Sequence, residues 1–233
     1  MTLQLFSSHV KCVDLHSEDS LADTISRQDR MPRQERESDV IETFSSSADL
    51  PEVTQWKVHS RRSHYENKWV SVHILDVEPP DGADRYEHHV IVVPYRAVGV
   101  VVHHLEKGVL LLYRSRFITD TVGFELPAGG VEPGESSSEA AAREVLEETG
   151  WTVTEPRIFL TANASAGVSD QKVDFAYARA IESVGEPKDA FESDRLYWVP
   201  VDQVLSLIKE GLVPDSGTMT GLMYAYAFGY LNG

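Results

Sequence analysis

The chain has 233 residues and a formal net charge of −16, and its 25% charged and 42% hydrophobic residues are ordinary for a globular protein. This length allows one sizeable domain with an appendage, and the negative charge argues against a nucleic-acid partner because the chain would repel a polyanion. A single cysteine, Cys12, excludes an intrachain disulfide, and without an apolar run of membrane-spanning length or a signal-peptide core we expect a cytoplasmic protein with no membrane partner.

Residues 1–52 differ in composition from the rest of the chain. Ser, Asp, Glu and Arg dominate, aromatic side chains are almost absent, and neither helical nor strand periodicity is sustained. Such a segment cannot bury enough apolar surface to offset the conformational entropy that ordering would remove. We therefore expect a disordered or loosely held N-terminal extension.

Residues 53–95 are predicted to form a small antiparallel sheet. Strands are expected at 56–59, 69–77 and 86–93. In the second of them, WVSVHILDVE alternates apolar and polar residues, as a half-buried strand does. The PPDG sequence at 79–82 is a turn signal between the second and third strands.

Residues 96–233 are predicted to form the main domain. Apolar runs predict buried strands at 97–103 and 109–113, joined by a hairpin turn, with further strands at 124–127, 151–160, 173–178 and 196–199. The polar stretch 181–195 is interpreted as a loop, and amphipathic helices are expected at 201–211 and 218–231. The apolar stripes expected to be core are Val201, Val204, Leu205 and Ile208 on the first helix, and Met219, Leu222, Met223 and Tyr226 on the second.

A third helix is predicted at 137–149, between a glycine-rich loop and a strand. Ser136 and Glu139 have the spacing of a capping box, in which each side chain accepts a backbone N–H that the helix leaves free. Three alanines follow, which favour a helix and allow close packing against a sheet. Gly150 stands where a left-handed C-terminal cap would lie.

This helix carries an acidic pattern. Glu144, Glu147 and Glu148 are three and four residues apart, so their carboxylates share one face. Like charges at this spacing repel by a few tenths of a kcal/mol (~0.2–0.5) for each pair. Arg143 is the basic residue within the cluster and would pair with one carboxylate and orient it. The pattern fits either a site for Mg²⁺ or Mn²⁺, which prefer oxygen ligands, or a solvated acidic face.

A longer pattern contains these residues. Five residues separate Gly129 from Glu135, seven separate Glu135 from Arg143, and the sequence then runs REVLEETGW. This resembles the Nudix box, G-x5-E-x7-R-E-U-x-E-E-x-G-U with U apolar, at every specified position. The resemblance implies the Nudix α/β/α sandwich with a mixed sheet, and a loop–helix–loop that binds divalent metal and hydrolyses a nucleoside diphosphate linked to another group.

The resemblance also implies roles for the residues of the box. It makes Glu144, Glu147 and Glu148 metal ligands, with the backbone carbonyl of Ala128 as a further ligand. Arg143 would orient these carboxylates, and Glu135 would support them. On this reading Arg143, Glu144 and Glu148 belong to the catalytic set, and Mg²⁺ is the expected cofactor, with Mn²⁺ as the alternative.

The predicted N-terminal sheet resembles that of ADP-ribose and nucleotide-sugar pyrophosphatases within the Nudix family, in the order W-x-V, YEN-x-W-V-x-V and PDG. Those proteins are typically homodimers in which this sheet contributes to the partner's substrate pocket, so we expect a homodimer. Tyr65 and Trp69 would then be stacking surfaces for a base. The alternative is that both are core aromatics.

Relatives in this subgroup also suggest substrate-binding and catalytic positions outside the box. Arg116, or else Arg114, would bind the substrate's phosphate or terminal sugar, because guanidinium binds phosphate bidentately; a surface salt bridge is the alternative. Glu125 is expected to line the pocket. A glutamate on the loop 181–195 would activate the attacking water: Glu192 is the first candidate, Asp194 the second, and Glu182 and Glu186 are also available.

The expected substrate is ADP-ribose or a nucleotide sugar, cleaved to a nucleoside monophosphate and a sugar phosphate. One feature departs from the ADP-ribose subgroup, whose S-P-G marker is Ser165-Ala166-Gly167 in this chain. Hydrolysis of another diphosphate, such as a dinucleotide, a coenzyme or an isoprenyl diphosphate, is therefore an alternative. A second alternative is a module that binds a nucleotide sugar without cleaving it.

Overall fold

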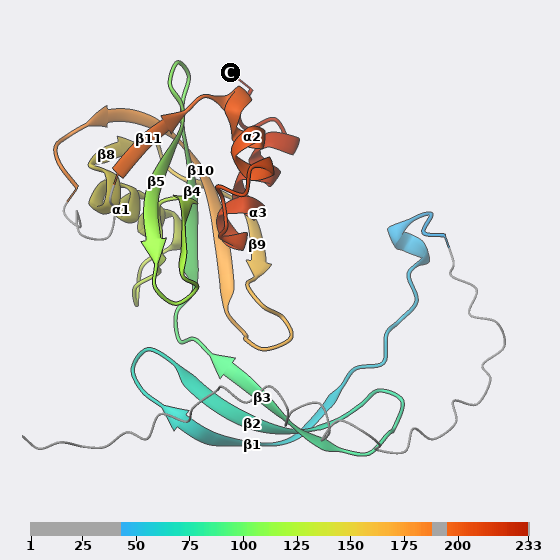
Figure 1. Ribbon diagram of the computed structural model, residues 1–233. Helices are drawn as coiled ribbons and strands as arrows, with labels where there is room; N and C mark the ends of the chain where they lie inside the picture. Colours follow the sequence, from blue (N-terminus) through green and yellow to red (C-terminus); the bar gives the residue numbers. More distant parts are fainter. Residues whose placement is uncertain (1–42, 188–194, 233) are drawn as a thin grey trace, which may run out of the picture. The chain divides into compact units, whose positions relative to one another are not determined.

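The structure is a computed structural model that describes residues 43–187 and 195–232 (Figure 1). The chain divides after Val53 into two units, and the part of the first unit that is described contains a short 3-10 helix, η1 (Ser47–Asp49), capped by the Ser46 side chain. Most of the predicted 1–52 extension lies outside the described residues. The domain boundaries expected from the sequence remain predictions.

The second unit begins with a three-stranded antiparallel sheet. Its strands are β1 (Lys57–Glu66), β2 (Ser71–Glu78) and β3 (Tyr86–Val92), in the order β1-β2-β3. Asn67 shapes the β1–β2 turn, because its side-chain oxygen accepts hydrogen bonds from the backbone N–H groups of Trp69 and Val70 at 2.7 and 2.8 Å. The small antiparallel sheet predicted from the alternating pattern is thus present.

A larger mixed sheet follows, with the strand order β11-β5-β4-β10-β8. Three further strands pair at its sides: β6 with β5, β7 with β4, and β9 with β10. Central β4 and β10 are parallel to each other, and the remaining pairs are antiparallel. The strands are β4 (Ala97–His104), β5 (Gly108–Arg116), β6 (Thr121–Glu125), β7 (Ala128–Gly130), β8 (Trp151–Val153), β9 (Arg157–Asn163), β10 (Lys172–Ser183) and β11 (Arg195–Val199).

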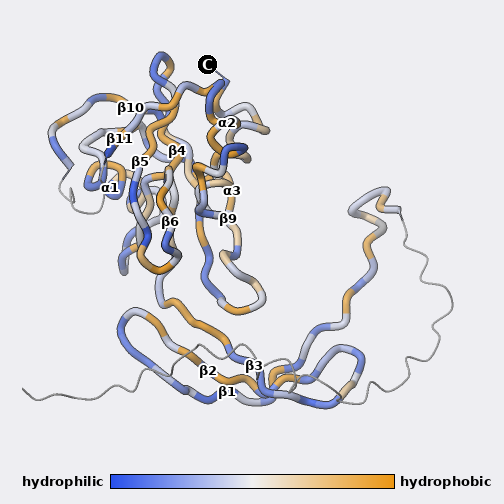
Figure 2. Tube along the Cα trace, viewed as in Figure 1, coloured by the Kyte–Doolittle hydropathy of each residue, from blue (hydrophilic) through white to orange (hydrophobic). Residues whose placement is uncertain are grey.

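Helices cover the two faces of this sheet, with α1 (Ser137–Thr149) on one side and α2 (Val204–Lys209) and α3 (Ser216–Ala227) on the other (Figure 1). Neighbouring residues of β4 serve opposite faces: Val98, Val100 and Val102 pack in the core with α1, and Val101 packs in the core with α3. Figure 2 shows hydrophobic residues recurring along β4 and α3. The fold is the α/β/α sandwich expected from the resemblance.

The predicted catalytic helix has the predicted bounds. The Ser136 hydroxyl accepts from the Glu139 backbone N–H at 3.2 Å, and the Glu139 carboxylate accepts from the Ser136 backbone N–H at 2.8 Å, which completes the capping box. Gly150 ends the helix in the left-handed region, at φ 68°. Among the described residues no helix is both long and apolar enough to cross a membrane.

Several predicted elements require correction. The expected strand 151–160 is two strands, β8 and β9, and β10 continues to Ser183 into the stretch interpreted as a loop. The expected helix 201–211 begins as a 3-10 turn, η2 (Val201–Gln203), before α2. The last helix starts at Ser216 rather than 218, because Asp215 caps it by accepting the Thr218 backbone N–H at 2.6 Å. It ends at Ala227 rather than 231.

The predicted apolar stripe of α3 was right for Leu222, which is fully buried, but wrong for its other three members. Met219, Met223 and Tyr226 are exposed, as is Leu205 on α2, and the residues that α3 buries are Thr218, Gly221, Leu222 and Ala225. Small residues allow α3 to lie close against the sheet. A Cβ added at Gly221 would stand 2.8 Å from the Leu126 side chain and 3.0 Å from that of Phe175.

Candidate active site

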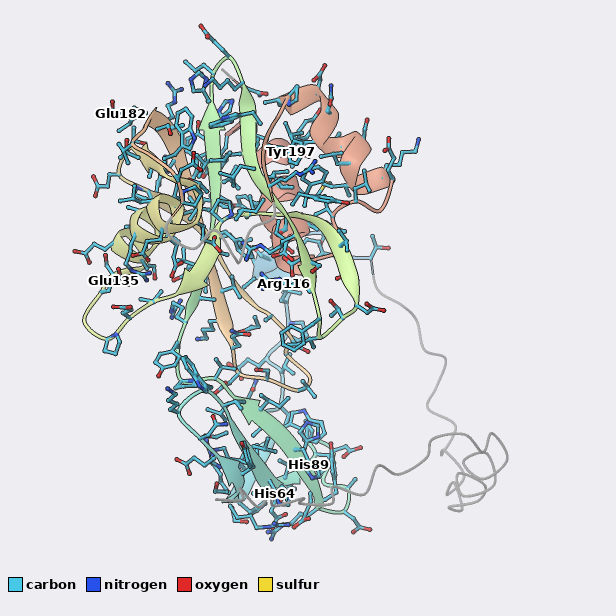
Figure 3. All side chains as sticks on the ribbon, turned by 60° about the vertical axis from the view of Figure 1, so that its left-hand side comes forward. His64, His89, Arg116, Glu135, Glu182 and Tyr197 are labelled. Atoms are coloured by element: carbon cyan, nitrogen blue, oxygen red, sulfur yellow. The ribbon has the colours of Figure 1, made fainter. Side chains whose placement is uncertain are left out.

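Arg143 is the centre of the charged face of α1. Its Nε and Nη2 donate to the Glu135 carboxylate, both at 3.0 Å, and its Nη1 donates to Glu144 at 2.8 Å and to Glu147 at 3.1 Å. Nη2 also donates to the backbone carbonyl of Gly130 at 2.9 Å. Glu135, which precedes α1 and is labelled in Figure 3, thus joins the carboxylates as expected. One guanidinium therefore fixes two helix carboxylates and the glycine-rich strand β7 relative to one another.

Glu144 lies directly against β7. A Cβ added at Gly129 would stand 2.1 Å from the carboxyl carbon of Glu144, so only glycine leaves room for this carboxylate. Burial raises the pKa of Glu144 above its ordinary value; Arg143 opposes the rise, and the charges of Glu148 and Glu147 add to it. Glu144 is therefore a carboxylate whose ionised form gains from a nearby cation.

Glu148 is the most deeply placed of the three helix carboxylates, at 3% exposure. Its Oε1 accepts a hydrogen bond from Arg114 Nη2 at 2.8 Å, and its Oε2 accepts one from the backbone N–H of Ala128 at 2.9 Å. Both oxygens are thus engaged, and Ala128, the residue whose carbonyl is the further predicted ligand, is hydrogen-bonded to the same carboxylate through its own N–H.

The two predicted substrate arginines differ in environment. Arg116 is half-exposed, and its Nε and Nη2 donate to the Glu125 carboxylate at 2.9 and 2.5 Å. Glu125 is almost fully buried, and its pairing raises the pKa of Arg116. Arg114 is buried, so it does not present a free guanidinium to solvent.

A cavity of about 470 Å³ lies beside these residues. Arg116, which is labelled in Figure 3, contributes to it with Glu125, Ala128, Phe175 on β10 and the start of α3. The remaining lining residues are Ala97, Val98, Gly99, Leu126, Ala162, Asn163, Ala164, Gln171, Val173, Asp215, Ser216, Gly217, Thr218 and Thr220. The structure therefore brings Arg116, Glu125 and Ala128 together at one cavity.

A second cavity, of about 810 Å³, shares Arg116, Glu125, Asp215 and Ser216 with the first. Its other lining residues are the buried Arg114, the hydroxyl residues Ser115, Thr119 and Thr121, and the apolar residues Phe117, Ile118 and Pro214. Phe117 and Ile118 are consecutive and almost fully exposed, at 94% and 84%. The two cavities therefore adjoin each other at Arg116.

Sequence reasoning did not find the contribution of α3 to this site. The signal was present in Pro214-Asp215 followed by Thr218, which is the pattern of an N-cap aspartate before a helix. The Thr218 hydroxyl accepts from the Leu126 backbone N–H at 3.1 Å, which ties the helix start to the segment between β6 and β7. The location of this helix against the cavity depends on tertiary packing.

Other predicted site residues lie elsewhere or outside the described ranges. Tyr65 and Trp69 are exposed, at 54% and 64%, so the alternative that they are core aromatics is wrong, and neither lines the two cavities. Glu192 and Asp194 fall within 188–194, outside the described residues. Glu182 and Glu186 are exposed.

The donors present fit a hard divalent cation. Glu144, Glu147 and Glu148 supply carboxylate oxygens, the Ala128 carbonyl supplies a backbone oxygen, and both are ligands that Mg²⁺ and Mn²⁺ prefer. In 43–187 and 195–232 no three acidic, histidine or cysteine side chains already converge as an ion-binding cluster. Arg143 holds oxygens of Glu144 and Glu147 instead, so a cation would replace part of the Arg143 contacts.

Comparison with known proteins is consistent with this geometry. Residues 93–219 match the family model described as NUDIX domain. The chain is 33% identical over 175 residues to CMP-5'-(N-acetyl-N-hydroxy-3-aminopropyl)phosphonate hydrolase from Streptomyces rubellomurinus, covering 75% of this chain and 84% of the relative. It is 27% identical over 171 residues to ADP-ribose pyrophosphatase from Bacillus subtilis, covering 72% and 91%. A crystal structure of ADP compounds hydrolase has the same fold, with a TM-score of 0.66 at 18% identity over 77% of this chain and 96% of that one.

Proposed function

Because this chain belongs to the Nudix family and is a hydrolase of phosphorus anhydrides, we propose that its substrate is ADP-ribose or a nucleotide sugar, which it cleaves to a nucleoside monophosphate and a sugar phosphate. The observation that carries the proposal is that the charged face of α1 adjoins the 470 Å³ cavity, which Arg116 lines. Ala128 belongs to both, because its N–H binds Glu148 and the residue lines the cavity. A diphosphate in this cavity would lie between a cation site and a guanidinium.

The residues divide the work of hydrolysis. Glu144, Glu147 and Glu148, with the Ala128 carbonyl, would hold Mg²⁺, or alternatively Mn²⁺, and Arg143 would orient the carboxylates. When bound, the cation neutralises diphosphate charge and lowers the pKa of a bound water. Arg116 would bind a phosphate oxygen through its half-exposed guanidinium. A loop carboxylate, with Glu192 as first candidate, would accept the proton of the attacking water.

The second cavity would receive the part of the substrate beyond the diphosphate. Its hydroxyl groups match those of a sugar, and exposed Phe117 offers a ring face to a base or other planar group. We further propose that the protein acts in the cytoplasm as a homodimer, in which Tyr65 and Trp69 contribute to base binding.

A specific observation favours a second candidate substrate. The Streptomyces rubellomurinus relative, of which 84% aligns with this chain, is named for hydrolysis of a CMP-linked phosphonate. In addition, Ala166 stands where the ADP-ribose subgroup carries proline. A nucleotide linked to a phosphonate is therefore the alternative to ADP-ribose, and the carboxylates and Arg116 would serve both.

Product analysis with Mg²⁺ tests the proposal. The panel is ADP-ribose, several nucleotide sugars, a CMP-linked phosphonate, dinucleotides, coenzyme A and isoprenyl diphosphates, with Glu148→Gln run alongside. Release of AMP and ribose 5-phosphate by the wild type, but not by Glu148→Gln, would support ADP-ribose hydrolysis. Turnover of the phosphonate alone would favour the second candidate, and full activity of Glu148→Gln would refute the assignment of the metal ligands.

A further inference from the structure

Arg114 and Arg116 lie two residues apart on β5, yet only one of them is accessible. The Arg114 side chain is 4% exposed and that of Arg116 is 50% exposed. Residues at this spacing on a strand point to the same face, so both guanidinium groups are directed toward the same region of the domain. Their different exposures indicate two different roles, which the sequence alone could not distinguish.

Arg114 is committed to partners inside the protein. Its Nη2 donates to Glu148 Oε1 at 2.8 Å, and both of these side chains are about 4% exposed. Its Nε lies 3.5 Å from Glu125 Oε2, close enough for charge attraction, but makes no hydrogen bond. A guanidinium held in this way cannot turn toward a substrate without leaving the Glu148 carboxylate buried with one partner fewer.

Glu148 in turn depends on Arg114 for its orientation. The Ala128 backbone N–H binds Oε2, and Arg114 binds Oε1. A carboxylate bound at each oxygen by a donor from a different strand has a fixed plane. The Arg114 bond also compensates a negative charge that burial would otherwise penalise.

We propose that Arg114, which borders the second cavity but is almost fully buried, is a positioning residue for the metal ligand Glu148, and that the half-exposed Arg116 is the arginine that contacts the substrate. Glu125 links them, because its carboxylate accepts three hydrogen bonds from Arg116 and lies beside Arg114 Nε. The inference rests on the proposed metal site for Glu148. It assigns Arg114, which resembles a phosphate ligand in sequence, to the interior of the site.

Mn²⁺ binding without substrate tests this assignment, measured by electron paramagnetic resonance on the full chain at pH 7. Loss of an outer partner of a metal ligand typically weakens metal binding by about 10- to 100-fold. We expect Arg114→Gln to weaken Mn²⁺ binding by at least about tenfold and the matched control Arg116→Gln to change it by less than about threefold. Unchanged or tighter binding in Arg114→Gln, or equal weakening in both variants, would overturn the proposal.

Arg114→Lys covers the case in which Arg114→Gln does not fold, as judged by circular dichroism. Lysine keeps the buried charge but loses the fixed planar fork of donors. A folded Arg114→Lys protein should bind Mn²⁺ at least about threefold more weakly than the wild type. Wild-type affinity in this variant would overturn the proposal.

Steady-state kinetics provide a second, independent test, measured with the substrate that the wild type hydrolyses best. Arg114→Gln should lower kcat with KM within about threefold of wild type, and Arg116→Gln should mainly raise KM. A rise in KM alone for Arg114→Gln would assign it to the substrate and overturn the proposal. Failure of the entire substrate panel would refute the proposed function but leave the Mn²⁺ comparison intact, so the two failures are distinguishable.

Discussion

The carboxylate of Glu144 fills the space that a side chain at Gly129 would need, because a Cβ on Gly129 would lie 2.1 Å from the carboxyl carbon of Glu144. The glycine on β7 therefore sets where a predicted metal ligand on α1 can lie. Gly129 has a φ available to other residues, so the requirement comes from the close approach of Glu144 and not from backbone conformation.

Gly129→Ala should reduce activity strongly with little loss of stability. The added methyl group meets the end of a flexible side chain, which can move aside, but the movement displaces a ligand. We expect kcat to fall by about 100-fold, the loss typical of a misplacement near 1 Å, and the free energy of unfolding to change by less than about 1 kcal/mol. Gly130→Ala is the matched control, because a Cβ there meets nothing within 4 Å. Equal activities of the two variants would contradict the prediction.

Glu144→Gln should separate stability from metal binding. A carboxyl group whose pKa is raised in the fold stabilises it only below its ordinary value of 4.5, and this contribution is lost as the pH rises through the folded pKa. Ionised Glu144 is therefore a net cost at pH 7 without metal. We expect metal-free Glu144→Gln to be no less stable than wild type at pH 7 in urea unfolding with EDTA, and to gain less stability when Mg²⁺ is added.

The pH series provides the check on this reasoning. The advantage of Glu144→Gln should shrink as the pH falls toward 4.5, because wild-type Glu144 then becomes protonated. A variant that is less stable than wild type across the whole range would show that the Arg143 contact outweighs the penalty of burying the charge.

Asp174→Asn should destabilise the fold at neutral pH. Buried Asp174 accepts bonds from Arg96 at 2.8 Å and from Ser137 and Thr161 at 2.6 Å each, so it joins the starts of β4 and α1 to β9 and β10. Burial alone would raise the pKa of Asp174, but these donors outweigh it and hold the pKa below its ordinary value of 3.8. Loss of the charge should lower the free energy of unfolding by about 2–4 kcal/mol at pH 7.

The direction of this pKa shift fixes the pH dependence. A lowered pKa contributes stability above the ordinary value of 3.8, and the contribution is lost as the pH falls through the folded value. The difference between wild type and Asp174→Asn in urea unfolding should therefore be constant from pH 7 down to about pH 5 and fade only in stronger acid. The exposed Asp202→Asn is the control, with an expected change within about 0.5 kcal/mol.

Phe117→Ala should weaken use of the second cavity. If this ring covers the group beyond the diphosphate, its removal loses about 1–2 kcal/mol of binding, which raises KM by about 5- to 30-fold for the preferred substrate. Leu105→Ala is the control, because Leu105 is also an exposed apolar residue at a hairpin turn and lines neither cavity. The same KM in both variants would remove Phe117 from the proposed site.

The parts of the fold that could be predicted from the sequence are those set by residues close together in the chain. Helix α1 has the predicted bounds because its cap, its alanines and Gly150 all act within a few residues. The carboxylates and Arg143 lie together as expected, because helical spacing alone puts them on one face. The division of the predicted 151–160 strand into two could not be predicted, because it depends on pairing partners: β8 pairs with the end of β10 and β9 with its beginning.

Tertiary contacts explain what the sequence could not predict. A 3.6-residue stripe of Met219, Met223 and Tyr226 looked like a buried face, but α3 buries small residues that permit close contact with Leu126 and Phe175. Likewise Arg114 and Arg116 look equivalent in sequence. Only the tertiary contact between Arg114 and Glu148 of α1 reveals that one is enclosed and the other is not.

The segment 165–170 contacts the end of the small sheet and also adjoins the smaller cavity. Its Val168 carbonyl accepts the Ile91 N–H of β3 at 2.8 Å, the Asp170 side chain accepts the Val93 N–H at 3.2 Å, and the flanking residues Asn163, Ala164 and Gln171 line the smaller cavity. A chimera that imports this loop from a relative without the matching β3 would lose these bonds. The loop should therefore keep its backbone contacts in a chimera only when the loop and β3 are exchanged together.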